Sequence, residues 1–294
     1  MRAAKRVALA VVLASFLAWY AMRFRAEWQQ VSFPPLAHSL GILALAMGLS
    51  LVNYLLRALR WSFYLGRRGH PHGFGFGLLA YLAGFAFAIS PAKLGELSRA
   101  RYYKSRGTPL SELAAVSIVE RLIDVAAMLI LATLVLAAFP RYTLTVTLIA
   151  AAAFVAGVLL LCLPWRALDA ARSLLHPRYV LIGLVIGLIA WSAEGVGFYL
   201  LSTMFGPAKI SIAAAVGIYA LATIVGAATL VPAGLIGTEA AMAALLVASG
   251  YSAPDALLVT LASRFTTLWF AVALGWLTVL LLELRTVRRP VSIP

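Results

Sequence analysis

The residues that could do chemistry are charged side chains inside long apolar stretches. Charges in a membrane helix cost about 2.5–3.5 kcal/mol each on insertion scales, so they usually pair or line a hydrated cavity. An Arg guanidinium can bind a phosphate through two parallel hydrogen bonds, and a carboxylate can pair with Arg or carry a proton. We therefore expect a binding site for a phosphate-bearing ligand. The candidates at or near membrane depth are Glu96, Glu120, Arg121, Asp124, Glu194, Glu239 and Arg264.

The motif VERLID holds three of these candidates. Glu120 and Asp124 are four residues apart and share a helix face, while Arg121 precedes Asp124 by three. Arg121 and Arg264 predict two Arg/Glu binding positions that face a shared central cavity. One position is reached from each leaflet.

A structural role is the alternative for these charges. Arg121 could pair with Glu96 or Asp124, and Arg264 with Glu239, each pair fixing a broken helix against the next span. Glu194, in WSAEGVGF, is a protonatable coupling group or a hydrogen-bonded structural residue, and the sequence leaves both readings open.

The composition is that of a polytopic membrane protein. The chain has 294 residues, of which 63% are hydrophobic and 12% charged, whereas a soluble domain is about one quarter charged. The net charge of +14 comes from short basic clusters beside apolar runs, which favours contact with anionic lipid head groups over nucleic acid. The single Cys162 excludes an intramolecular disulfide. No metal site, nucleotide motif or other cofactor is predicted.

The apolar runs predict six transmembrane helices and two re-entrant hairpins. With both hairpins returning to the side they enter, 18 Lys and Arg residues, including Arg57, Arg60 and Arg99, face the cytoplasm, as do both termini. Eight or nine ordinary spans are the alternative.

The uninterrupted apolar runs, expected to cross the membrane, are 7–24, 36–57, 113–138, 144–163, 179–205 and 256–284, and the interrupted runs are 74–92 and 211–249. The residues expected to form the hairpins are Pro91, Gly95, Pro232, Gly234 and Gly237.

An internal repeat supports this topology. A shift of 143 residues aligns Arg121 with Arg264 and Glu96 with Glu239. Because one extra span separates the halves, they predict two inverted-topology repeats, a pattern typical of alternating-access transporters. The whole chain, 1–294, then forms one transmembrane domain. Its parts are a first span and loop at 1–35, repeat 1 at 36–138, a connecting span at 139–178, repeat 2 at 179–281 (179–284 with its flank), and a cytoplasmic tail at 285–294.

Three stretches, PAKLGELSRARYY, SIVERLIDVAAMLIL and PAGLIGTEAAMAALL followed by SRFTTLWFAVALG, resemble the transmembrane region of lysylphosphatidylglycerol synthases and its stand-alone flippase-like relatives. The chain departs from the family pattern at Ala92 and Ala233, where Gly usually follows the proline, and at Thr238, where a basic residue often precedes the Glu. The family motifs fall on Pro91, Gly95, Glu96, Glu120, Arg121, Asp124, Pro232, Gly237, Glu239 and Arg264.

The resemblance implies a bacterial inner-membrane protein that moves amphipathic lipids between leaflets. The partners it implies are membrane lipids: phospholipids, hopanoids or polyprenyl-phosphate lipids. We expect a flippase or scramblase, and not an enzyme, whose cavity takes an anionic or phosphate-bearing head. Two alternatives remain: a membrane transferase with Glu96 or Asp124 as general base, and a non-catalytic partner of a lipid-biosynthesis complex.

Overall fold

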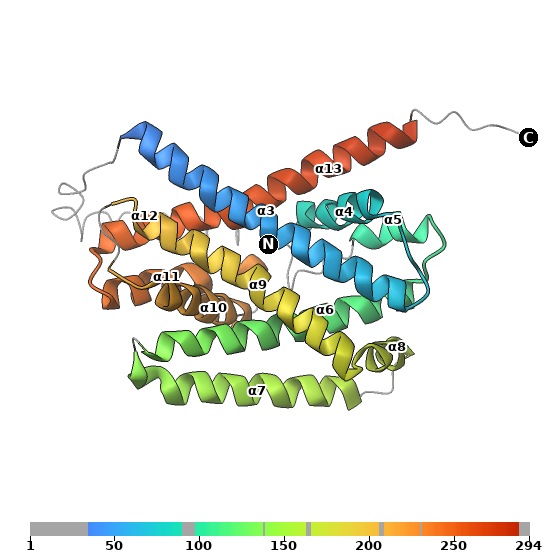
Figure 1. The fold of residues 1–294 in the computed structure, drawn as a ribbon, viewed down its shortest axis with the longest axis horizontal. Helices are drawn as coiled ribbons and strands as arrows, with labels where there is room; N and C mark the ends of the chain where they lie inside the picture. The colour runs from blue at the N-terminus through green and yellow to red at the C-terminus, as the bar shows by residue number, and fades with distance from the viewer. Residues whose placement is uncertain are drawn as a thin grey trace, which may run out of the picture.

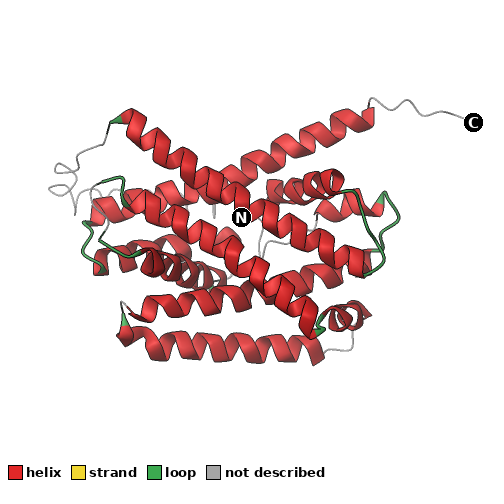
Figure 2. Cartoon of the chain, viewed as in Figure 1, coloured by secondary structure: helices red, strands yellow, loops and turns green. Residues whose placement is uncertain are grey.

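The computed structural model describes residues 35–89, 98–137, 139–162, 166–205, 209–229 and 231–287. All regular structure in these ranges is helical (Figure 2). Three helical stretches are long and apolar enough to cross a membrane: Leu36–Arg67, Pro177–Ser202 and Ala253–Leu284. The expected all-helical membrane protein is therefore confirmed in outline. The predicted span 7–24 and the hairpin residues Pro91 and Gly95 lie outside the described residues.

Helices α3 (Leu36–Arg67) and α9 (Pro177–Ser202) pack against each other along the centre of the molecule (Figure 1). Two glycines of α9 make close packing feasible. A Cβ on Gly183 would meet the Tyr64 hydroxyl at 1.9 Å, and a Cβ on Gly187 would meet Arg60 Nη1 at 2.9 Å. Both large α3 side chains thus fit against α9 because the glycines leave room for them.

Helix α3 continues ten residues beyond its predicted end at residue 57. The prediction ended the span at the first arginine and placed Arg57 and Arg60 on the cytoplasmic surface. The structure corrects this: Arg57 is 4% exposed and Arg60 is 0% exposed. Arg99, also expected at the cytoplasmic surface, is 2% exposed.

Helices α6 (Leu110–Ala132) and α7 (Thr143–Cys162) run alongside each other on one side of the α3–α9 pair (Figure 1). The 3₁₀ turns η3 (Thr133–Ala137) and η4 (Pro140–Tyr142) connect them. The short amphipathic helix α8 (Arg166–Leu174) packs on α6. At this end of α6, Arg68 binds Glu112 at 2.6 Å, and this contact lowers the pKa of the Glu112 carboxyl.

The interrupted run 211–249 forms a helical hairpin. Helices α10 (Ile212–Ala228) and α11 (Gly237–Ala248) pack against each other, and the turn η5 (Pro232–Gly234) lies between them. This turn has positive φ at Ala233 (55°), Gly234 (65°) and Ile236 (71°). A Cβ on Gly237 would meet Thr229 Cγ2 at 2.6 Å, so the hairpin closes tightly because this position has no side chain.

The other interrupted run begins with α4 (Phe74–Ala83) and the 3₁₀ helix η1 (Gly84–Phe87), and α5 (Ala100–Lys104) follows the gap in the described residues. The last stretch of the chain comprises α12 (Ala253–Arg264), the π-helical turn η6 (Phe265–Trp269) and α13 (Phe270–Val287).

Each interrupted run packs on the final span of the other half of the chain. Helix α4 and η1 contact α13, whereas α10 contacts α6 and η3. Both contacts depend on a glycine. A Cβ on Gly275 would lie 2.1 Å from the Ala86 backbone nitrogen, and a Cβ on Gly217 would lie 2.4 Å from that of Val135. The two halves are therefore interlocked through backbone approaches that only glycine permits.

Candidate functional site

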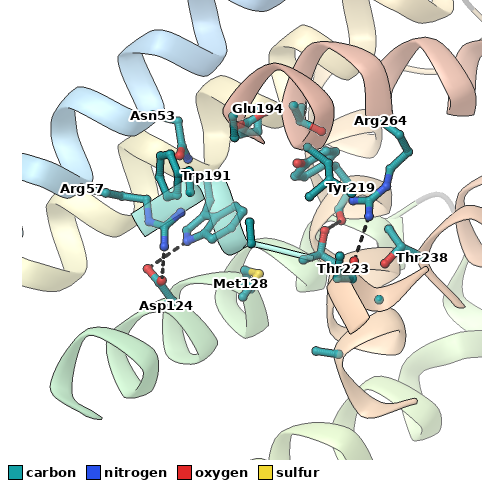
Figure 3. A pocket seen from close by; sticks show the side chains of 18 of the residues that line it. Asn53, Arg57, Asp124, Met128, Trp191, Glu194, Tyr219, Thr223, Thr238 and Arg264 are labelled. Carbon is teal, nitrogen blue, oxygen red and sulfur yellow. Dashed lines mark hydrogen bonds and ion pairs between the residues drawn. The ribbon is translucent and has the colours of Figure 1, made fainter. Parts of the chain in front are cut away.

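A cavity of about 280 Å³ lies where α3, α6, α9, α10 and α12 meet (Figure 3). Its wall is mixed, with apolar and aromatic side chains between charged ones. Arginines and carboxylates from both halves of the chain face it. The titratable and hydrogen-bonding residues of the lining are Asn53, Tyr54, Arg57, Arg121, Asp124, Trp191, Glu194, Tyr219, Thr223, Thr238, Arg264 and Thr267.

Asp124 is at the centre of the charged wall on the α6 side. Arg57 Nη2 donates to its Oδ2 at 3.2 Å, and Arg60 Nη2 donates to its Oδ1 at 2.5 Å. Trp191 Nε1 also donates to Oδ1, at 3.1 Å. Three donors from α3 and α9 therefore hold one carboxylate of α6, and a carboxylate held in this way is stabilised as an anion.

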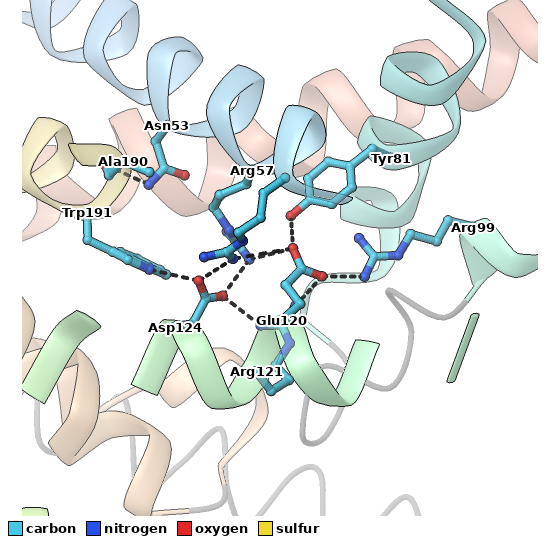
Figure 4. Close-up of polar contacts among 10 residues, drawn as sticks. Asn53, Arg57, Tyr81, Arg99, Glu120, Arg121, Asp124, Ala190 and Trp191 are labelled. Carbon is cyan, nitrogen blue, oxygen red and sulfur yellow. Dashed lines mark hydrogen bonds and ion pairs between the residues drawn. The ribbon is translucent and has the colours of Figure 1, made fainter. Parts of the chain in front are cut away.

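Glu120 lies one helical turn before Asp124 and is fully buried. Tyr81 donates its hydroxyl to Oε1 at 2.5 Å, and Arg99 Nη2 donates to Oε2 at 2.7 Å (Figure 4). The Arg99 guanidinium also stacks on Trp61, 3.7 Å from the ring centroid. This arrangement joins α4 and the segment before α5 to α6.

The two carboxylates are shared among four arginines. Arg57 and Arg60 lie 3.9 and 3.7 Å from Glu120 Oε1. Arg121 Nη1 lies 3.9 Å from Asp124 Oδ2, and the Arg121 side chain remains 36% exposed. Among the described residues, two of these four arginines, Arg57 and Arg121, also line the cavity. Guanidiniums in a low-dielectric cavity attract an anion.

Arg264 is on the opposite wall of the same cavity. Its Nε donates to Glu239 Oε1 at 2.6 Å, and its Nη2 donates to the Ala233 carbonyl at 2.8 Å. The side chain therefore joins the end of α12 to the start of α11 and to the hairpin turn. Ala233 has φ 55° and ψ 15°, a left-handed conformation that costs a non-glycine residue about 1–2 kcal/mol.

Other polar contacts form the rest of the wall. Ser50 donates to Glu194 Oε2 at 3.1 Å, and Asn53 Nδ2 donates to the Ala190 carbonyl at 2.8 Å. The Tyr54 hydroxyl donates to the carbonyl of Thr267 at 2.6 Å, inside the π-helical turn. In Figure 3, Asn53 lies near Arg57 and Trp191, and Glu194 lies between Asn53 and Arg264.

The structure brings most of the predicted site residues together. Four of them line the cavity directly: Arg121, Asp124, Glu194 and Arg264. Glu120 and Glu239 lie behind it, each bonded to an arginine. The hairpin residues Pro232, Gly234 and Gly237 are in and next to the η5 turn, and Gly234 also lines the cavity. Glu96 lies outside the described residues.

Sequence reasoning missed Arg57, Arg60 and Arg99 as site residues, because the excess of basic residues on one side assigned them to the membrane surface. One signal was present: Arg57 and Arg60 are three residues apart in NYLLRALRWSFYL, where apolar and aromatic residues continue beyond both. That spacing puts both guanidiniums on one helix face. Among the residues that the structure describes, no group of three His, Cys, Asp or Glu could hold a metal ion.

The family model of the lysylphosphatidylglycerol synthase TM region matches residues 7–275. The matched range includes every charged residue that lines the cavity. None of the curated proteins matches the chain.

Proposed function

The chain belongs to the family of the lysylphosphatidylglycerol synthase transmembrane region, and from this premise we propose that it moves a phosphate-bearing lipid between the leaflets of the bilayer. The lipid phosphate enters the cavity between the arginines of the two walls, and its acyl chains stay in the membrane. The protein thus acts as a flippase or scramblase of the bacterial inner membrane.

One observation carries the proposal: Arg121 and Arg264, which occupy equivalent positions in the two halves, line one cavity. A guanidinium binds phosphate through two parallel hydrogen bonds. Arg57, which lines the same cavity and contacts Asp124, adds attraction for an anion from the α6 wall. A site with arginines from both halves can pass an anion from one to the other.

The packing of the two halves supports the proposed inverted repeat. Helix α4 contacts α13, and the corresponding helix of the second half, α10, contacts α6. A pseudo-twofold axis produces such reciprocal contacts, since each hairpin then packs on the last span of the other half. In the proposed topology, six helices cross the membrane, both hairpins re-enter, and both termini are cytoplasmic. The two hairpins face opposite leaflets.

The contacts of Asp124 favour transport over the transferase alternative, in which Asp124 would act as a general base. A general base must accept a proton, and Asp124 already accepts hydrogen bonds from Arg57, Arg60 and Trp191. These donors stabilise the anion and weaken it as a base. The second candidate base, Glu96, lies outside the described residues.

Reconstitution tests the proposed function. The purified protein is inserted into phosphatidylcholine liposomes that contain fluorescent phosphatidylglycerol or phosphatidylethanolamine, and the label in the outer leaflet is bleached with dithionite. We expect a bleached fraction well above one half, because lipid from the inner leaflet reaches the outside. A bleached fraction equal to that of protein-free liposomes, for both probes, contradicts the proposal. A new product in mass spectra of the extracted lipids favours the transferase.

The third reading, a non-catalytic partner of a biosynthetic complex, makes a different prediction. In that case the cavity arginines are not needed for lipid transfer, and neutral substitution leaves the function of the complex intact. If a cavity variant folds but no longer transfers lipid, the result supports transport and contradicts the hypothesis of a non-catalytic partner.

A further inference from the structure

The two walls of the cavity hold their arginines in different ways. On the α6 wall, each carboxylate contacts several arginines, so Glu120 and Asp124 keep charged partners when any one guanidinium turns to a ligand. On the opposite wall, Glu239 is the only carboxylate within 4.0 Å of Arg264 among the described residues. The positions equivalent to Glu120 and Asp124 in the second half are Ser263 and Thr267.

Glu239 depends on Arg264. Its Oε1 accepts from Arg264 Nε, while its Oε2 is buried and has no hydrogen-bond partner among the described residues. Its side chain is 19% exposed. A mostly buried carboxylate that loses its cation is costly to keep charged.

The occupied edge of Arg264 is one of the two edges that can bind a phosphate through two hydrogen bonds. Nε and Nη2 form one side of the planar guanidinium, and this fork matches two oxygens of one phosphate group. In the structure, Glu239 occupies Nε and the Ala233 carbonyl occupies Nη2. A phosphate that binds this fork must therefore displace both acceptors.

We propose that lipid binding at Arg264 is coupled to protonation of Glu239, so that one proton accompanies each monoanionic lipid through the site. The lipid phosphate takes the Nε–Nη2 fork of Arg264, and the displaced Glu239 carboxylate accepts a proton (as hydronium) from the aqueous phase on the side from which the lipid enters. When the lipid leaves, Glu239 returns the proton to water and binds Arg264 again. This inference rests on the proposed transport function and adds its energy source.

The charge count of the step is balanced. Before binding, Arg264 and Glu239 together are neutral. After binding, the Arg264–phosphate pair is neutral and so is the protonated Glu239, because one negative and one positive charge have entered together. The site therefore stays neutral throughout, and the combined movement of lipid and proton carries no net charge across the membrane.

Among the described residues, the helices packed against α11 have few titratable groups, and the other carboxylates at the cavity, Asp124 and Glu194, are on α6 and α9. Helix α11 packs mainly against α10 and α12. The only titratable side chain of α10 is Tyr219, and those of α12 are Asp255 and Arg264. Asp255 is in the first turn of α12, nine residues before Arg264, which is about 14 Å along a helix. Helix α11 itself has no titratable residue besides Glu239.

The same exchange releases the hairpin turn. Arg264 Nη2 holds the carbonyl of Ala233, whose backbone is in the left-handed region. When the phosphate replaces that carbonyl, the strained turn loses its hydrogen bond, and the start of α11 loses its link to α12. Binding of lipid and proton is thereby connected to movement of the α10–α11 hairpin.

The leaflet distribution of a lipid in proteoliposomes tests this inference. Fluorescent phosphatidylglycerol, a monoanion, is equilibrated with a pH difference of one unit across the membrane. The fast initial phase of dithionite bleaching, before further lipid crosses, then measures the fraction in the outer leaflet. With one proton per lipid, we expect up to a tenfold enrichment in the leaflet on the alkaline side, since one pH unit corresponds to a factor of ten. A potassium diffusion potential at equal pH should leave the distribution even.

Two variants complete the test. Glu239→Gln cannot exchange a proton, so any lipid it moves should remain evenly distributed under the pH difference. Glu112→Gln, which changes a carboxylate bonded to Arg68 away from the cavity, should behave as wild type. If Glu239→Gln fails to fold, the wild-type distribution alone decides.

The two proposals fail in different ways. If the wild-type protein moves no phosphatidylglycerol at any pH, the transport function is wrong. If it moves the lipid but the distribution stays even under a pH difference, or shifts with the electrical potential, the proton coupling is wrong and transport stands. Enrichment that persists in Glu239→Gln also overturns the role of Glu239.

Discussion

Arg60 Nη2 lies 2.5 Å from Asp124 Oδ1, and this contact joins α3 to α6 in a region that solvent does not reach. A buried ion pair of this kind adds little net stability compared with a well-packed apolar pair, but removing one partner leaves the other charge uncompensated. The pair therefore fixes the relative position of the two helices more than it drives folding. It places Asp124 and Arg57 at the cavity wall, and Arg57 stacks on Trp191 at 5.1 Å.

Loss of the Arg60 charge should destabilise the protein strongly. We expect Arg60→Met to lower the free energy of unfolding by about 3–5 kcal/mol, because Asp124 and Glu120 lose a buried partner. Denaturant unfolding in detergent, followed by tryptophan fluorescence, measures the effect. Arg101→Gln is the matched control, since Arg101 is 73% exposed and pairs with Glu283 at the surface; it should change stability by less than about 1 kcal/mol. Equal effects of the two substitutions would contradict the buried network.

Transport should require the guanidinium group of Arg264, and a positive charge alone should not be sufficient. Arg264→Ala should abolish lipid transfer in proteoliposomes, and Arg264→Lys should retain a small part of it. Lysine keeps the positive charge but cannot make the bidentate contact with phosphate. It also cannot reproduce the pair of hydrogen bonds that Arg264 donates to Glu239 and to the Ala233 carbonyl. Size-exclusion profiles show whether both variants fold. Full transfer by the Ala variant would remove Arg264 from the mechanism.

Ala233 should be less stable in its turn than glycine would be. The left-handed conformation costs Ala about 1–2 kcal/mol, whereas glycine pays about 0.5–1 kcal/mol in lost chain entropy. Ala233→Gly should therefore raise the free energy of unfolding by about 0.5–1 kcal/mol. Ala240→Gly, at an exposed position inside α11, should lower it by about the same amount. A destabilising Ala233→Gly would show that the turn is not strained.

The glycine contact between α10 and η3 should tolerate no side chain. A Cβ on Gly217 would lie 2.4 Å from the backbone nitrogen of Val135, so Gly217→Ala must push the hairpin away from the end of α6. We expect a loss of about 1–3 kcal/mol in stability, as for other overpacked cores. Gly48→Ala is the control, because nothing lies within 4 Å of a Cβ there and alanine favours the helix. Thermal unfolding of both variants measures the difference, and similar melting temperatures would contradict the close approach.

The sequence by itself determined the membrane class, the helical fold and most of the charged residues that matter. These features follow from local chemistry: apolar runs of membrane length, and ionisable residues that are costly inside them. The residues Arg121, Asp124, Glu194 and Arg264 were accessible in the same way, whereas the family was inferred from the resemblance of its sequence motifs. All four line the cavity.

Only the tertiary structure decided which charges meet. The positive-inside rule placed Arg57 and Arg60 at the cytoplasmic end of a span. That rule uses only the positions of basic residues along the chain, so it takes no account of a carboxylate on another helix. Asp124 lies 64 residues from Arg60 along the chain and 2.5 Å from it in the fold. Likewise, Glu239 is the partner of Arg264 because the hairpin turn brings the start of α11 to the end of α12. Pairing in a low-dielectric interior stabilises both members, so the surroundings of each arginine, and not its position in the chain, decide whether it anchors a helix or faces a ligand.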